Sequence, residues 1–248
     1  LGVHVGVQNF HGEDATVKNN NFNEISLVGR KNLSTNTYLQ AKLIRLDGKD
    51  WTPSLHTLLL ASTPSKHWHV EFSTDKNMIE TASALARHLT VNTYSASAEY
   101  IISKQHTVHA TIYQQEITDN NKRHGVALQY KYKPSWFNHG YFKLRGKQRS
   151  ADFDAAEYFS PADFSQYHLL VGYEKNLNEA QNLHLLAEVG IGQQYINHVG
   201  EDAYEYRLGV RGWIKRHNFL DTYYACTTDG GLNNYRYCSA RLVYHYLW

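Results

Sequence analysis

Hydrophobic and polar residues alternate with a period of two along most of the chain. Near the C-terminus every second position from Cys238 to Trp248 is apolar or aromatic, and Ser239, Arg241 and His245 lie between these positions. Because successive side chains of a β-strand point to opposite faces, this spacing predicts a strand with one apolar and one polar face. The same pattern predicts about fourteen strands, at residues 1–8, 21–31, 35–46, 54–62, 66–74, 92–102, 106–116, 124–133, 140–149, 165–175, 182–196, 203–214, 219–227 and 236–248.

Residues 77–89 break this alternation. Apolar residues such as Ile79 and Leu85 recur there at helical spacing, and Asn77 with Glu80 three positions later forms a capping pair. The segment therefore predicts one short helix, in an outer loop or in the lumen of the structure. With this segment as a helix the strand number is even, as is usual for bacterial β-barrels, and sixteen strands is the alternative count.

The connections between the expected strands fall into a shorter and a longer set. With Trp248 placed on the periplasmic side, the short turns are 32–34, 63–65, 103–105, 134–139, 176–181 and 215–218. The outer loops are then 10–20, 47–53, 75–91, 117–123, 150–164, 197–202 and 228–235. Short periplasmic turns and long outer loops are typical of transmembrane barrels. We therefore expect one domain, residues 1–248, with an all-β fold: a transmembrane antiparallel up-and-down β-barrel in the outer membrane of a Gram-negative bacterium.

Composition agrees with this interpretation. The chain contains 19 tyrosines, 9 phenylalanines and 5 tryptophans, and its mean hydropathy is −0.56. A low average does not exclude a membrane barrel, because lipid-facing and lumen-facing residues cancel. The net charge of +2 is too small to indicate a nucleic-acid partner. A soluble β-sandwich or a lipocalin-like barrel is the alternative, but such folds rarely carry this many strands in 248 residues.

Charged residues on the polar faces of the strands would line the interior of the barrel. The pore-lining set comprises Lys131, Lys143, Arg145, Lys147, Arg207, Arg211 and Arg241 with Glu99, Glu174, Glu188, Glu205 and Asp221. A mixed lumen of this kind can form salt bridges across a closed barrel, or it can line a hydrated path for polar solutes. Both interpretations remain open at this point.

One of the long outer loops, residues 150–164, is acidic. It carries Asp152, Asp154, Glu157 and Asp163. It follows directly on a strand whose polar face is basic, so the loop can fold inward as a constriction or lid. A solvated surface loop is an equally good interpretation.

Two further groups of residues have candidate chemistry. Cys226 and Cys238 are equidistant from the turn of the last expected hairpin, so they lie opposite each other and can form a cross-strand disulfide or remain two small hydrophobic residues. His67, His69 and Glu71 have the spacing of a metal site on one strand. With 15 histidines in the chain, three lumen-facing polar residues is the better interpretation, and we expect no metal or other cofactor.

Enzymatic activity is not expected. Ser239, His245 and Asp221 face the polar side and are the candidates for a nucleophile, a base and an acid. Ser239 and His245 are six residues apart on one strand, roughly 20 Å by the rise of a strand, which is too far for a hydrogen bond.

The C-terminal strand resembles the closing strand of bacterial outer-membrane β-barrels. Arg241, Tyr246 and Trp248 occupy the polar and aromatic positions of that pattern, and Val243 stands where those proteins usually have glycine. The resemblance implies that this strand is the recognition signal for the barrel-insertion machinery, and that the chain is surrounded by outer-membrane lipid.

Four stretches resemble the C-terminal barrels of exopolysaccharide export porins, the cellulose and poly-N-acetylglucosamine type that follow a periplasmic tetratricopeptide scaffold. The stretches are 79–85, 94–100, 158–161 and 189–194. The resemblance implies a passive, hydrated conduit for a polysaccharide, without catalytic residues, and a periplasmic scaffold preceding Leu1. Those barrels have about sixteen strands. The competing hypotheses are a plugged structural or receptor barrel whose outer loops bind a partner protein or phage and, as a minor alternative, an outer-membrane barrel enzyme.

Overall fold

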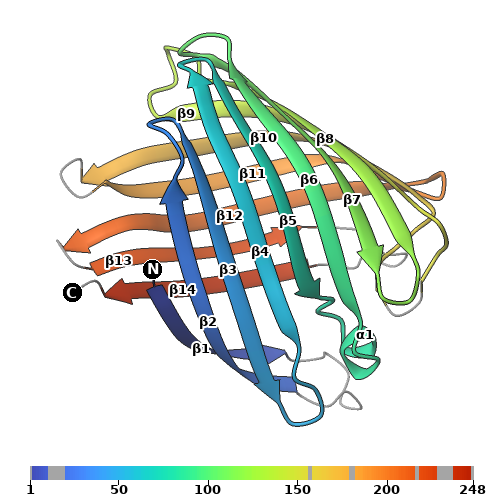
Figure 1. The fold of residues 1–248 in the computed structure, drawn as a ribbon. Helices are drawn as coiled ribbons and strands as arrows, with labels where there is room; N and C mark the ends of the chain where they lie inside the picture. Colours follow the sequence, from blue (N-terminus) through green and yellow to red (C-terminus); the bar gives the residue numbers. More distant parts are fainter. Residues whose placement is uncertain are drawn as a thin grey trace. The chain divides into compact units, whose positions relative to one another are not determined.

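The strands follow one another around a single sheet in the order of the sequence. A computed structural model of the chain describes residues 2–10, 20–155, 158–178, 182–215, 218–227 and 237–246. Within these residues it contains one short helix and fourteen strands, which are hydrogen-bonded in the order β1 to β14 (Figure 1). The expected all-β, antiparallel up-and-down fold with about fourteen strands is confirmed. No helix in the described part of the chain is long and apolar enough to cross a membrane, which carries no information about crossing by strands.

The strand bounds are close to those expected from the alternation. The strands are β1 Gly2–Phe10, β2 Asn20–Asn32, β3 Thr37–Gly48, β4 Ser54–Ser65, β5 Trp68–Met78, β6 Thr90–Ile101, β7 His106–Ile117, β8 Lys122–Tyr132, β9 Gly140–Ala151, β10 Asp163–Asn178, β11 Leu183–Ile196, β12 Val199–Lys215, β13 Asn218–Thr227 and β14 Tyr237–Tyr246.

The expected helix over residues 77–89 is much shorter in the structure, where α1 spans Ala82–Ala86. The prediction was wrong at the start of the segment, because Asn77 and Met78 continue β5 and pair with β6. Thr81 is the N-cap, and its hydroxyl accepts a hydrogen bond from the Ala84 amide at 3.2 Å. A threonine that satisfies a free amide of the first turn therefore replaces the expected Asn77–Glu80 capping pair.

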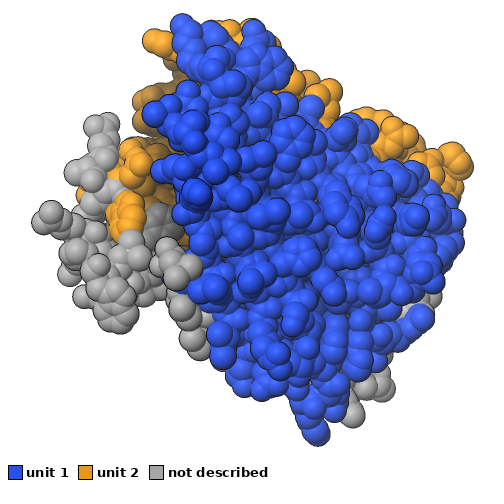
Figure 2. Space-filling view, in the orientation of Figure 1, with its two compact units in different colours: residues 1–100, 110–126, 149–162 blue, residues 101–109, 127–148, 163–248 orange. Residues whose placement is uncertain are grey.

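The chain divides into two compact units, each of which is described by itself (Figure 2). Unit 1 contains residues 1–100, 110–126 and 149–162. Unit 2 contains residues 101–109, 127–148 and 163–248.

Burial within each unit is the reverse of what a water-soluble protein shows. In β2 of unit 1, Glu24 is 5% exposed, whereas its neighbour Ile25 is 60% exposed. In β11 of unit 2, Glu188 is 7% exposed, whereas Val189 is 60% exposed. Charged side chains are almost never fully buried unless they are paired, and large exposed apolar patches mark surfaces that meet something other than water. Each unit therefore has a polar face with buried charges and an exposed apolar face.

Other exposed apolar side chains extend this apolar face along the strands. They include Leu27, Leu43, Leu58, Leu60, Phe72, Tyr94, Ile112 and Val126 in unit 1, and Leu128, Leu144, Tyr167, Leu169, Val171, Ile191, Leu208 and Tyr224 in unit 2.

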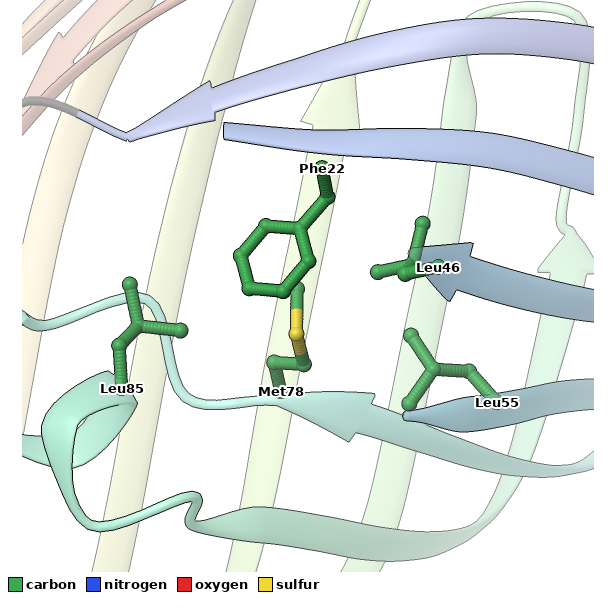
Figure 3. Packing of buried hydrophobic residues seen from close by; sticks show 5 residues of the cluster. All are labelled: Phe22, Leu46, Leu55, Met78 and Leu85. Atoms are coloured by element: carbon green, nitrogen blue, oxygen red, sulfur yellow. The ribbon is translucent and has the colours of Figure 1, made fainter. Parts of the chain in front are cut away.

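At one end of unit 1 the polar face is covered by apolar packing around α1. Leu85 of α1 belongs to one buried cluster with Phe22, Leu46, Leu55 and Met78, which come from β2 to β5 (Figure 3). Phe22 is on the same face as Glu24, two residues away, and Leu46 is opposite Glu24 in the register of β2 and β3. Phe22 and Leu46 therefore occupy polar-face positions, as does Leu55, which is opposite Ile44. We call the packed segment of residues 79–89 the α1 cap.

The connection between β9 and β10 joins this packing. Tyr158 is buried in a second cluster that contains Ala84 and Leu89 of the α1 cap. The Tyr158 hydroxyl donates to Asp119 at 2.7 Å and accepts from the Asn121 amide at 3.1 Å. Burial raises the pKa of Tyr158 to about 12, with the hydrogen bond to Asp119 as the second cause. The segment is therefore held at the end of unit 1 by both apolar and polar contacts.

Candidate functional site

Glycines on the polar face of unit 2 leave space above the backbone that neighbouring residues fill. The ring of Tyr141 on β9 lies over Gly172 on β10, where any side chain would overlap the ring. On β11, a side chain at Gly190 would meet Leu170, and one at Gly192 would meet the backbone of Tyr167. An aromatic ring that covers a strand glycine shields its exposed backbone. Because Gly172 has no side chain, the Tyr141 ring from β9 can lie across β10, and the β11 glycines let Leu170 and the backbone of β10 approach closely.

Glu188 is the most buried carboxylate of this polar face. It accepts a hydrogen bond from the Tyr141 hydroxyl at 2.6 Å and forms an ion pair with Lys143. Both partners come from β9, so the contact crosses β10. A buried carboxylate is stable only when it is paired and hydrogen-bonded, and here both conditions are met.

Arg145 extends the same arrangement by one strand. Its Nη1 donates to Glu205 Oε1 at 3.2 Å, its Nη2 also contacts the Glu205 carboxylate, and Nη2 donates to Nδ1 of His168 at 3.1 Å. Glu205 is on β12, so the guanidinium side chain spans β10 and β11. The bidentate contact fixes the geometry of the pair as well as its charge.

Glu174 on β10 holds a third group of charges. Lys131 Nζ is 3.1 Å and Lys133 Nζ is 3.5 Å from Glu174 Oε2. Glu174, Glu188 and Glu205 therefore each have a basic partner from β8 or β9. The ion pairs run along the polar face of unit 2 between nearby strands, and whether this face lines a pore stays a prediction.

A polar cavity of about 380 Å³ opens on this face between β10 and β13. Its lining includes Arg207, Gly209 and Arg211 of β12 with Asp221 and Tyr223 of β13. In the register, Gly209 is opposite Tyr223 and Arg211 is opposite Asp221. The Arg207 guanidinium carbon lies 5.2 Å from the centre of the Tyr223 ring. Exposed guanidinium groups and an aromatic ring in one cavity are suited to binding a polar ligand.

The remaining pore-lining candidates are more scattered. Glu99 lies in unit 1, half-buried and opposite His69. Lys147 lies in unit 2, with its ammonium group 5.5 Å from the centre of the Phe164 ring. Arg241 is opposite Tyr223 in β14, but its side chain lies outside the described part of the structure. A pore-lining role for these residues stays a prediction.

The acidic residues of the expected lid loop do not form one group. Asp152 and Asp154 are exposed, and Asp154 accepts a hydrogen bond from the Ala162 amide at 2.6 Å. Asp163, the first residue of β10, lies 3.6 Å from His198. Glu157 is outside the described residues. Tyr158, which was named from the sequence only as part of the stretch 158–161, makes buried contacts in this segment.

The other candidate groups are also located. Cys226 and Cys238 are opposite each other in β13 and β14 and form a disulfide. His69 Nε2 and Glu71 Oε1 are 2.9 Å apart, and no group of three or more metal-ligating side chains occurs among the described residues.

Asp221 lies in the polar cavity of unit 2. Ser239 and His245, the other two residues of the candidate enzymatic set, have side chains outside the described part of the structure.

Sequence reasoning missed the residues that organise the polar face. Tyr141 and His168 were not singled out, although both contact charged groups there. The available signal was the glycine at alternate positions in β11, Gly190 and Gly192, because glycine inside a strand marks close approach of another group.

Comparison with known proteins supports the fold. A solved structure titled "Bacterial polysaccharide outer membrane secretin" matches with a TM-score of 0.67 and 11% identity, covering 91% of this chain and 80% of that one. The crystal structure of Pseudomonas aeruginosa OpdQ matches with a TM-score of 0.44 and 11% identity, covering 98% of this chain and 77% of that one. No family model matches the sequence, and no curated protein matches it. The first similarity shows a shared fold at very low identity.

Proposed function

We propose that the chain is the membrane-spanning part of an outer-membrane channel that gives a polar solute a hydrated path. The observation that carries the proposal is the reversed burial of the strands, in which apolar side chains are exposed and carboxylates are buried on the opposite face. Exposed apolar strand faces are stable against lipid, and a polar opposite face can line an aqueous lumen. Outer-membrane lipid surrounds the chain, and the barrel-insertion machinery recognises its C-terminal strand.

The solute that we propose is an exopolysaccharide on its way out of the cell. The similarity in fold to a protein titled as a polysaccharide outer membrane secretin supports this choice. So does the cavity lined by guanidinium groups and a tyrosine ring, because these groups bind sugar hydroxyls and sugar faces. The conduit is passive, without catalytic residues or cofactors, and a periplasmic scaffold delivers the polymer to it.

Conductance in planar lipid bilayers tests the channel proposal directly. The purified chain is reconstituted and single insertions are recorded, with heat-denatured chain as the control. We expect stepwise conductance, and a folded chain that inserts without conducting would contradict the proposal. Membrane fractionation tests the location, because the chain should be recovered with the outer membrane.

A second candidate function is a capped barrel that acts as a receptor. The packing of Leu85 and Tyr158 over polar-face positions of unit 1 favours it, because this packing excludes water there. Leu85→Ala removes the side chain that joins α1 to the strands, whereas Leu33→Ala shortens an exposed side chain in the β2–β3 turn and serves as the control. Higher conductance of Leu85→Ala alone means that the cap limits a channel. If Leu85→Ala and wild type are both silent, the receptor function is favoured.

A further inference from the structure

The cavity in unit 2 depends on a glycine between two arginines. Arg207 and Arg211 are each two residues from Gly209 on β12, so all three positions are on the polar face, and the arginines are roughly 13 Å apart along the strand. A Cβ atom at Gly209 would lie 3.0 Å from the Thr222 carbonyl oxygen and 3.2 Å from the Tyr223 Cβ. Gly209 therefore forms the floor of the cavity, and the ring of Tyr223 stands beside it.

Positive charge exceeds negative charge around this cavity. Glu174 in the lining is held by the two lysines Lys131 and Lys133. Arg211 has Asp221 opposite it in the register.

Arg207 is the remaining cation of the cavity. It is opposite Glu188, which already accepts from Tyr141 and Lys143. Among the described residues Arg207 makes no ion pair of its own, and its guanidinium group is exposed beside the Tyr223 ring. The local charge therefore favours a ligand that brings a carboxylate.

The shape and chemistry of the lining narrow the ligand further. The volume of about 380 Å³ is in the range of small-molecule sites, which is roughly 300–1,000 Å³. A guanidinium group binds a carboxylate through two parallel hydrogen bonds, and a tyrosine ring offers an apolar face with a polar tip. His184 and Asp221 add groups that can hydrogen-bond hydroxyls. An acidic sugar presents all three partners at once: a carboxylate, a C–H face and hydroxyls.

We propose that this cavity is a binding site for a carboxylate-bearing sugar residue, with Arg207 as the carboxylate ligand and Tyr223 as the stacking surface. The inference rests on the proposed channel function and deepens it, because it assigns an acidic glycan as the transported class. His184 is the second residue of β11, so the cavity lies near the edge of the sheet where β10 ends and β11 begins. From the sequence we expect that edge to be on the periplasmic side, which places the site near the periplasmic entrance of the proposed channel.

Calorimetric titration of the full chain in detergent micelles tests the site. The probe is trigalacturonate, and its methyl ester is the matched neutral ligand. We expect the ester to bind at least ten-fold more weakly, and added salt to weaken the acid but not the ester. Arg207→Gln should weaken acid binding about ten-fold, the usual loss for one charge-assisted contact. Gly209→Val should fill the floor and weaken both ligands. Lys175→Gln removes an equal charge from the other face and should change neither.

The comparison of acid and ester on the wild-type chain does not depend on any variant folding. Equal affinity for acid and ester, no binding of either, or an Arg207→Gln variant that binds like Lys175→Gln would each overturn the site. Bilayer conductance of the same preparations separates this result from the channel proposal. If the chain conducts but shows no preference for the acid, only the acidic-glycan site is refuted. If the chain binds the acid but does not conduct, only the channel proposal is refuted.

Discussion

Tyr141 and Gly172 should be strongly coupled in the stability of the chain. The Tyr141 ring fills the space where a side chain at Gly172 would be. Gly172→Ala alone forces the ring away and should cost about 1–3 kcal/mol, the usual range for overpacking. Tyr141→Ala alone removes a buried ring and its hydrogen bond to Glu188 and should cost about 3–5 kcal/mol. In the double variant the alanine methyl at position 172 occupies vacated space, so we expect a favourable coupling of about 1–3 kcal/mol.

Urea unfolding in detergent or thin-bilayer vesicles measures the free energy of unfolding of the wild type, the two single variants and the double variant. Gly146→Ala is the matched control, because its Cβ would lie 3.5 Å from the Tyr167 ring, an ordinary contact distance. Tyr141→Phe keeps the ring and loses the hydroxyl bond to Glu188, so it should cost about 1.5–3 kcal/mol. Adding Gly172→Ala to Tyr141→Phe should cost as much unfolding free energy as adding it to the wild type, because the ring is still present.

Additivity would refute this account of the polar face. If the two single costs sum to the double cost within about 0.5 kcal/mol, the ring does not rest on Gly172. If Gly172→Ala costs no more than Gly146→Ala, the glycine at position 172 is not required by the Tyr141 ring.

Three further outcomes follow from other contacts. Burial raises the pKa of Tyr158 to about 12, so the stabilisation from its neutral side chain is fully present below the unfolded pKa of about 10 and is lost as the pH rises toward 12. In urea unfolding, the free energy of unfolding should therefore fall less from pH 9 to pH 11 for Tyr158→Phe than for the wild type. Replacing Cys226 and Cys238 by serine should lower the unfolding free energy by about 3 kcal/mol, because the bond closes a loop with a sequence separation of 12; unchanged urea midpoints would contradict this. Asn121→Ala removes hydrogen bonds to Phe153, Tyr158 and Ser160 and should speed protease cleavage within 152–162, with a rate equal to wild type as the contrary result.

The strands were predictable because backbone pairing requires side chains to alternate between two faces. The prediction for β11, 182–196, agrees with the observed Leu183–Ile196 to one residue. The loop expected at 197–202 is instead a two-residue turn, and β12 begins at Val199. Asn197 and His198 both have positive φ, 47° and 71°, which is the conformation of the tight turns that continue the twist of a hairpin. Asparagine and histidine both adopt positive φ more often than most residues, but Asn-His is not one of the glycine-containing pairs that mark such a turn in a sequence.

The sequence predicts which residues lie on the polar face, but it does not predict which of them form ion pairs with one another. Alternation assigns Arg145 and Glu205 to one face, but they are 60 residues apart and three strands apart in the sheet. Whether the two side chains meet depends on the stagger of the two strands between them and on how far a side chain can extend across those strands. For Tyr141 the extension depends on Gly172, because the ring crosses β10 where that residue has no side chain and its hydroxyl then reaches Glu188.

Apolar residues at positions where the alternation expects polar ones indicate where another segment covers the polar face. Phe22, Leu46 and Leu55 are apolar at polar-face positions, and Leu85 of α1 belongs to the same buried cluster. A face lined by water along its whole length would have no reason to carry apolar residues at the same level on neighbouring strands, because each would expose apolar surface. Such coincident exceptions on β2, β3 and β4 therefore indicate a covering segment before any coordinates are known. By the same reasoning, a chain that kept Leu85 but replaced these three residues with serine should lose the α1 cap, and protease protection of residues 79–89 would report that loss.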